Sequence, residues 1–155
     1  MSKEEKIDLY ELLSDHVTGE SQYVVIYSAL NKLPLNLPNL KWDFLRCFSD
    51  FVKEGKTILI PCFSFSFTNT GKFDWLKGKS EVGLLGDWTR DLMFAVRTKH
   101  PIYSFVCIGQ NEEHMRRLIS CDHASAFGEN SIFSYLTNRN TRIVMLGADW
   151  KYCTQ

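Results

Sequence analysis

The sequence has no excess of charge of either sign. Among its 155 residues, 18 are Lys or Arg and 18 are Asp or Glu, so the formal net charge is zero. This balance argues against a nucleic-acid-binding domain, which typically carries a basic face. No apolar run approaches the roughly 20 residues that a membrane-spanning helix needs. We therefore expect a soluble protein with neither a nucleic-acid partner nor a membrane partner.

A secretory leader and a cysteine framework are also missing. The start, MSKEEKIDLYELL, is charged and lacks the basic end and apolar stretch of a signal peptide. The number of cysteines is odd and none form a CxxC pair, which favours neither disulfides nor a zinc site. We expect a cytoplasmic protein without a metal, in which most of the thiols pack as small apolar side chains: Cys47, Cys62, Cys107, Cys121 and Cys153.

The common short catalytic signatures are absent. The chain has no GxxxxGK[ST], GxGxxG, HExxH or GxSxG, the patterns of P-loop, dinucleotide, zinc-protease and serine-hydrolase sites. It also shows no internal repeat, low-complexity tract or linker. With 45% hydrophobic residues, a chain of this length can bury one substantial core, so residues 1–155 are expected to form a single domain.

The hydrophobic patterning that is present alternates between two periods. Runs rich in β-branched and aromatic residues predict buried strands over 23–27, 57–60, 102–108 and 142–146. Helical spacing predicts helices over 40–53, 80–96, 112–119 and 131–138, after a first helix that Ser2 and Glu5 cap and that ends near His16. This alternation predicts an α/β layered domain with a largely parallel central sheet flanked by helices.

Small residues follow the predicted strands. Ser28 follows the first strand, Ser64 and Ser66 follow the second, and Gly109 follows the third. Ligands of parallel sheets bind outside the carboxyl ends of the strands, so these residues are expected to line one crevice. The second strand runs into an unusual alternation of aromatic and small polar side chains over 63–67.

Three further segments allow a functional and a structural interpretation. Ser80 to Gly83 precedes a predicted helix, where free amides favour a phosphate, but Ser80 is equally suited to be a plain helix cap. His100 follows Arg97 and Lys99 in the sequence. In the functional interpretation it binds an anion or acts as a base, and in the structural one it belongs to a solvated turn. Glu129 either binds an amine or complements the dipole of the helix that follows.

Taken in order, these segments resemble the aminoglycoside 3-N-acetyltransferase family. Residues 27–30 are similar to its His-Ser-Ser-Leu, and residues 60–62 to its strand ending in Pro-Thr, both in degraded form. Clearer similarities follow to its Phe-Asp (73–74), Pro-Ser-x-x-Gly-x-Leu (79–85), Arg-Ser-x-His-Pro (97–101), Phe-Gly-Glu-x-Ser (127–131) and Leu-Leu-Gly (145–147). The shared order and spacing make the resemblance specific.

The resemblance implies acetyl-CoA as co-substrate and direct transfer of its acetyl group to an amine of an aminoglycoside or other amino sugar, with no covalent enzyme intermediate. It implies cofactor contacts at Ser28, Ser80, Gly83, Arg97 and His100. It also implies that two carboxylates face a cationic acceptor, those of Asp74 and Glu129.

The same resemblance places the family's base histidine beyond Gln155, so we expect a domain that is incomplete at its carboxyl end or a shortened relative, and no catalytic residue is assigned. Two alternatives stay open. Tyr27 and Ala29 are compatible with a binding or assembly module that kept the fold and lost the chemistry, and Cys62 with His100 would suit a cysteine-dependent acyl hydrolase. A homo-oligomer is compatible with the sequence.

Overall fold

The computed structural model describes residues 8–33, 39–121 and 124–152. The capping box expected at Ser2 and Glu5 lies outside these residues. The described chain forms one five-stranded sheet of β1 (Tyr23–Ser28), β2 (Thr57–Pro61), β3 (Ala95–Arg97), β4 (Phe105–Ile108) and β5 (Thr141–Leu146). The strands lie in the order β3-β4-β2-β1-β5.

The sheet is mixed, with one reversed strand. β1 pairs in parallel with both β2 and β5, whereas β4 is antiparallel to its neighbours β2 and β3. Four strands therefore point in one direction and β4 points in the other. The carboxyl ends of β5, β1 and β2 consequently meet at the same edge of the sheet, where the crevice was expected.

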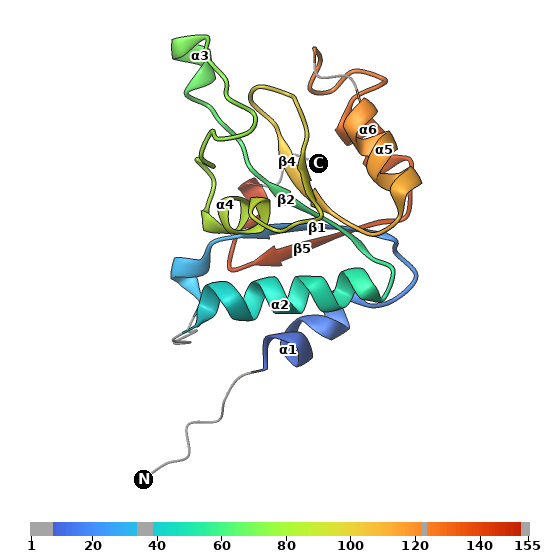
Figure 1. Ribbon diagram of the computed structural model, residues 1–155. Helices are drawn as coiled ribbons and strands as arrows, with labels where there is room; N and C mark the ends of the chain where they lie inside the picture. The colour runs from blue at the N-terminus through green and yellow to red at the C-terminus, as the bar shows by residue number, and fades with distance from the viewer. Residues whose placement is uncertain (1–7, 34–38, 122–123, 153–155) are drawn as a thin grey trace.

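Helices cover both faces of the sheet (Figure 1). One face carries α1 (Leu9–Val17), α2 (Leu40–Lys53) and α4 (Leu84–Arg90), and the other carries α5 (Glu112–Ser120) and α6 (Ile132–Thr137). Shorter turns complete the described elements: η1 (Leu30–Lys32), α3 (Phe67–Thr70) and η2 (Trp150–Tyr152). The predicted α/β layered domain is confirmed. None of the helices in the described ranges is both long and apolar enough to span a bilayer.

The central strand β1 shows why both of its faces must be covered. Val24 and Ile26 point into the core formed with α1 and α2, where Phe48 is fully buried. Val25 and Tyr27 point to the opposite core, formed with α5 and α6. Each fully buried side chain of this size stabilises the fold by about 1.5–3 kcal/mol, so β1 is anchored from both sides.

The helix predicted over 80–96 is wrong in extent. α4 covers only residues 84–90, and residues 95–97 form β3, in which Val96 pairs with Cys107 of β4. Gly83 has a φ of 129°, far from helical values, and so α4 cannot continue toward Ser80. Apolar spacing alone could not distinguish this arrangement, because the β3–β4 ladder overrides local helical preference.

Candidate functional site

A cavity of about 400 Å³ opens at the carboxyl ends of β1 and β2. Four separated parts of the chain line it: residues 26–29, the end of β2 with Phe63 and Phe65, the segment 81–83 with Leu85 and Gly86, and Ala148 after β5. We call it the Ser28 cavity. Its position is that at which open α/β sheets bind their ligands.

Ser28 and Gly83 meet in this cavity. A Cβ on Gly83 would lie 3.5 Å from the Ser28 carbonyl oxygen and 3.7 Å from its Oγ. Because the positive φ of Gly83 is one that other residues rarely adopt, this wall carries no side chain, and a ligand can approach the backbone closely. These are two of the residues that the sequence singled out for cofactor contact, and the structure brings them together.

Ser80 lies beside the cavity wall and is not the cap of α4. The residue that flanks the helix is Gly83, three positions later. The Ser80 amide donates to Asp87 Oδ1 at 3.0 Å, and its Oγ accepts from the Val82 amide at 3.3 Å. Ser80 therefore shapes the turn that leads to Gly83, and it does not itself line the cavity.

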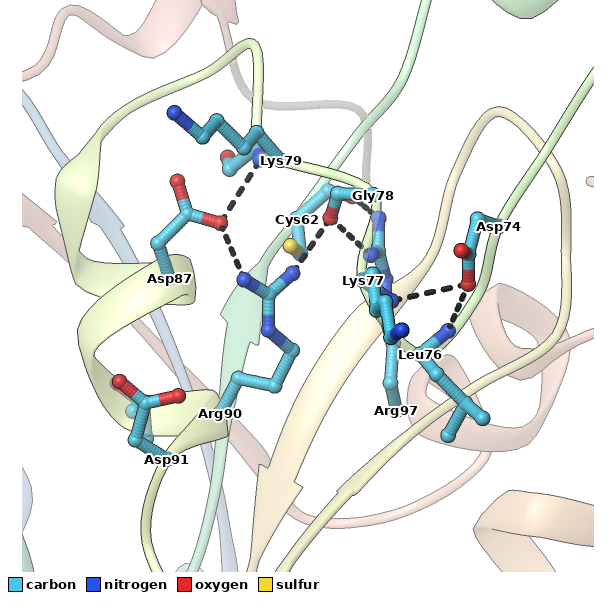
Figure 2. A network of polar contacts seen from close by, with 12 residues as sticks. Cys62, Asp74, Leu76, Lys77, Gly78, Lys79, Asp87, Arg90, Asp91 and Arg97 are labelled. Atoms are coloured by element: carbon cyan, nitrogen blue, oxygen red, sulfur yellow. Dashed lines mark hydrogen bonds and ion pairs between the residues drawn. The ribbon is translucent and has the colours of Figure 1, made fainter.

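Arg97 is buried, with only 3% of its surface exposed, and its side chain lies beside Cys62 and Gly78 (Figure 2). Its Nε donates to Ser104 Oγ at 3.0 Å, and its Nη2 donates to the Cys62 carbonyl at 2.8 Å. Its Nη1 donates to the Gly78 carbonyl. Burial lowers the pKa of the guanidinium. Arg97 thus ties β2, β4 and the preceding loop together, and the structure does not place it in the lining of the Ser28 cavity.

Arg90 reaches the same carbonyl from α4. Its Nη1 donates to the Gly78 oxygen at 2.5 Å, and its Nη2 lies 3.4 Å from Asp87 Oδ1, the atom that also accepts from Ser80. A Cβ on Gly78 would lie 2.5 Å from the Asp74 carbonyl oxygen, so only glycine fits there. The two arginines therefore hold the loop 74–83, which ends in the cavity wall.

Three other sequence-predicted residues lie outside the Ser28 cavity. Asp74 is exposed, and its Oδ1 accepts from the Leu76 and Lys77 amides, both at 3.0 Å. His100 Nδ1 accepts from the amides of residues 102 and 103, at 3.1 and 3.0 Å, within the β3–β4 connection. Glu129 borders a different cavity, next to α5 and α6.

Glu81 is a lining residue that the sequence reasoning missed. Its two carboxylate oxygens accept from the Ser66 amide at 3.2 and 3.1 Å, and the Ser66 hydroxyl donates to one of them. The sequence signal for this part of the site was the alternation of aromatic and small polar side chains over 63–67. Phe63 and Phe65 line the cavity, and Ser66 binds the Glu81 carboxylate. The segment 80–83 was singled out, but as an anion site and not for its carboxylate.

Cys62 is fully buried, and burial raises the pKa of its thiol. A Cβ on Gly86 would lie 3.3 Å from the Cys62 Sγ, which shows that the thiol packs against α4. It does not line the Ser28 cavity. A nucleophilic cysteine needs an accessible thiolate, so this geometry weighs against the acyl-hydrolase alternative. The cysteines within the described ranges are all unpaired, and Cys153 lies outside those ranges.

The family model described as aminoglycoside 3-N-acetyltransferase matches residues 27–155, most of the chain. The chain belongs to this family. The resemblance that the ordered motifs predicted is therefore confirmed, and the matched range includes every residue that lines the Ser28 cavity except Ile26.

Several solved structures share the fold of this family member. YokD from Bacillus subtilis is 19% identical with a TM-score of 0.76, covering 94% of this chain and 65% of that one. AAC-IIIb in a binary complex with CoASH is 18% identical with a TM-score of 0.75, covering 94% and 60%. The aminoglycoside acetyltransferase AAC(3)-IVa is 16% identical with a TM-score of 0.76, covering 93% and 55%.

The chain spans between 55% and 65% of the length of these three structures. At such identities the similarity demonstrates the fold, and the activity of the longer proteins does not transfer by itself. No curated protein sequence matches the chain significantly. Within the described ranges there is no group of three or more His, Cys, Asp or Glu side chains that could hold a metal ion.

Proposed function

We propose that this protein is an acetyl-CoA-dependent N-acetyltransferase that acts on an amino group of an aminoglycoside or related amino sugar. The observation that carries the proposal is the meeting of Ser28 and Gly83 in a cavity at the strand ends, in a chain of this family. Related structures support it: AAC-IIIb has been solved with CoASH, AAC-VIa with sisomicin, and an AAC(3)-IVa variant with apramycin.

The lining suits the thiol-bearing arm of the cofactor. Most of the lining side chains are apolar, among them Phe63, Val82 and Leu85. The Ser28 hydroxyl and the side-chain-free backbone at Gly83 offer polar groups for the arm's amides. In this proposal Ser80 and Arg97 act through the loop 74–83 and do not touch the cofactor.

The proposed reaction exchanges the C–S bond of the thioester for a C–N bond and removes one proton from the amine. The acceptor nitrogen attacks the thioester carbonyl, a C–N bond forms, the C–S bond breaks, and the thiolate of CoA leaves while the amine loses a proton. The described residues supply orientation and an apolar wall that keeps water from the thioester. The base that takes the proton is not assigned to a residue.

A second candidate is a binding module that holds the same ligands without turnover. Glu81 carries the carboxylate of the Ser28 cavity, and both of its oxygens already accept hydrogen bonds from Ser66. This arrangement suits holding a ligand in a fixed position. The two candidates share the cavity and differ only in whether acetyl transfer occurs.

Calorimetry with CoA tests both candidates. We expect wild-type protein to bind CoA, Ser28→Leu to abolish binding by filling the cavity, and Ser120→Leu, on the exposed end of α5, to leave it unchanged. A thiol-release assay with acetyl-CoA and sisomicin then separates transferase from binding module. If the folded wild-type protein shows no binding of CoA at millimolar concentration, the cofactor assignment is wrong.

A further inference from the structure

Glu81 is distinguished by where its carboxylate lies. Among the described residues that line the Ser28 cavity, it is the only Asp or Glu. The two carboxylates that the sequence suggested for acceptor binding lie elsewhere: Asp74 is engaged in its own turn, and Glu129 borders another cavity. Among the described lining residues, Glu81 therefore offers the carboxylate for a cationic acceptor in the cavity.

The carboxylate is fixed and still available. The Ser66 amide and hydroxyl hold it in one orientation, so little side-chain entropy is lost when a ligand binds. An ionised carboxylate offers about four acceptor positions, and Ser66 does not use them all. Glu81 is also exposed to solvent, so a ligand can reach it.

An aromatic ring lines the same cavity as this carboxylate. Phe65 lines the same cavity, is 43% exposed, and directly precedes the serine that holds Glu81. Its ring is fixed by edge-to-face contacts with Phe63 and Tyr103, each with 6.1 Å between ring centroids. A fixed ring and a fixed carboxylate in one cavity are suited to a sugar that carries an ammonium group, because the ring packs on the sugar and also attracts the cation.

We propose that Glu81 and Phe65 form the acceptor subsite of the Ser28 cavity. Glu81 binds an ammonium group of an amino sugar, and the face of Phe65 packs against the sugar ring. The inference deepens the proposed function and rests on its acceptor class. A carboxylate at this wall repels phosphate, so the anionic end of CoA lies away from Glu81 and the acceptor occupies the side of the cavity that Glu81 lines.

The test is calorimetric titration of the full chain with sisomicin and, separately, with CoA. Glu81→Gln keeps an oxygen for Ser66 and removes the charge, so sisomicin binding should weaken about tenfold or more, with the CoA affinity unchanged within about twofold. Glu81→Asp should restore part of the sisomicin affinity. Asp74→Asn and Glu129→Gln serve as matched controls and should leave both affinities unchanged.

Phe65→Leu tests the ring separately and should weaken sisomicin several-fold without affecting CoA. Equal sisomicin affinity in wild type and Glu81→Gln, a loss matched by Asp74→Asn, or no sisomicin binding by wild type would each overturn the subsite. If wild type binds sisomicin through Glu81 but does not bind CoA, the subsite stands and the proposed transferase function fails. Melting temperatures of all variants confirm that each remains folded.

Discussion

Gly83 lies directly against Ser28, because a Cβ atom on Gly83 would be 3.5 Å from the Ser28 carbonyl oxygen. Ser28 ends β1, and Gly83 precedes α4, so the contact joins a strand end to a loop 55 positions later. A ligand that binds the Ser28 hydroxyl therefore lies next to backbone that carries no side chain.

Gly83→Ala should impair both stability and ligand binding. The φ of 129° is strained for alanine, so we expect a loss of about 1–3 kcal/mol in the free energy of unfolding, measured by denaturant titration. The new methyl group also enters the wall beside Ser28, so CoA affinity should fall several-fold.

Gly71→Ala is the matched control, because Gly71 also has a positive φ, 63°, but a Cβ there would meet nothing within 4 Å. It should lose stability through backbone strain alone and keep the CoA affinity of the wild type. Equal CoA affinities in the Gly83 and Gly71 variants would contradict the role assigned to the Ser28–Gly83 contact.

Arg97→Lys should mainly lower the stability of the fold, and its effect on CoA affinity should be smaller. Lysine keeps the charge but cannot reach Ser104, Cys62 and Gly78 together, so the buried network loses several charge-assisted hydrogen bonds, although Arg90 still donates to the Gly78 carbonyl and Ser104 to the Cys62 carbonyl. We expect a loss of about 2–4 kcal/mol in the free energy of unfolding and faster amide exchange in the loop 74–83. A variant with wild-type stability and a large loss of CoA affinity would instead make Arg97 a direct cofactor contact.

Cys62 should resist alkylation in the native protein, so an alkylating reagent should not change the activity through this residue. Cys62 is fully buried and its thiol pKa is raised by burial, so iodoacetamide at pH 8 should leave it unmodified in the native state and modify it rapidly after unfolding. Peptide mass mapping measures both. If Cys62 is labelled rapidly in the native protein and thioester cleavage is lost as a result, that outcome would support the cysteine-dependent acyl hydrolase alternative.

Stability should decline at high pH, in part through Cys47. Burial, with help from the carboxylates of Asp50, Asp8 and Glu54, raises the pKa of this thiol to about 12. The unfolded thiol ionises near its ordinary pKa of about 9, and so between pH 9 and 12 the folded state binds the extra proton and stability falls as pH rises. Below pH 9 this contribution is fully present.

Cys47→Ala isolates that contribution. Above pH 9, the wild-type free energy of unfolding should fall more steeply than that of the variant, by up to about 1.4 kcal/mol per pH unit. Below pH 9 the two curves should run parallel, offset by the lost packing of the thiol. Parallel curves through pH 11 would show that Cys47 ionises equally in both states.

Four of the five strands and most helices could be predicted because their signals are local. The run of β-branched and aromatic residues over 23–27 predicted β1, and the helical spacing from Leu40 to Lys53 predicted α2 within its observed bounds. The segment 80–96 failed for the opposite reason: Val96 becomes a strand residue only because Cys107 lies beside it. No pattern within 80–96 contains that information.

The candidate site also contains residues that the sequence predicted and residues that only the structure revealed. Ser28 was expected at the crevice from its place after a strand, the family resemblance implied cofactor contacts at Ser28 and Gly83, and the fold brought the two together. Glu81 was missed because its partner is Ser66, 15 positions away, and the buried partners of Arg97 could not be read from the sequence. A charged residue's role depends on what surrounds it, and the surroundings are tertiary.

By itself, the sequence determined the layered α/β class, the family and the two residues that mark the cavity, because hydrophobic periodicity and ordered motifs are properties of neighbours along the chain. Only the tertiary structure decided the reversed direction of β4, the burial of Arg97, and the place of the Glu81 carboxylate in the lining of the Ser28 cavity. These depend on contacts between distant segments, whose energies arise only once the chain has packed and water has been excluded.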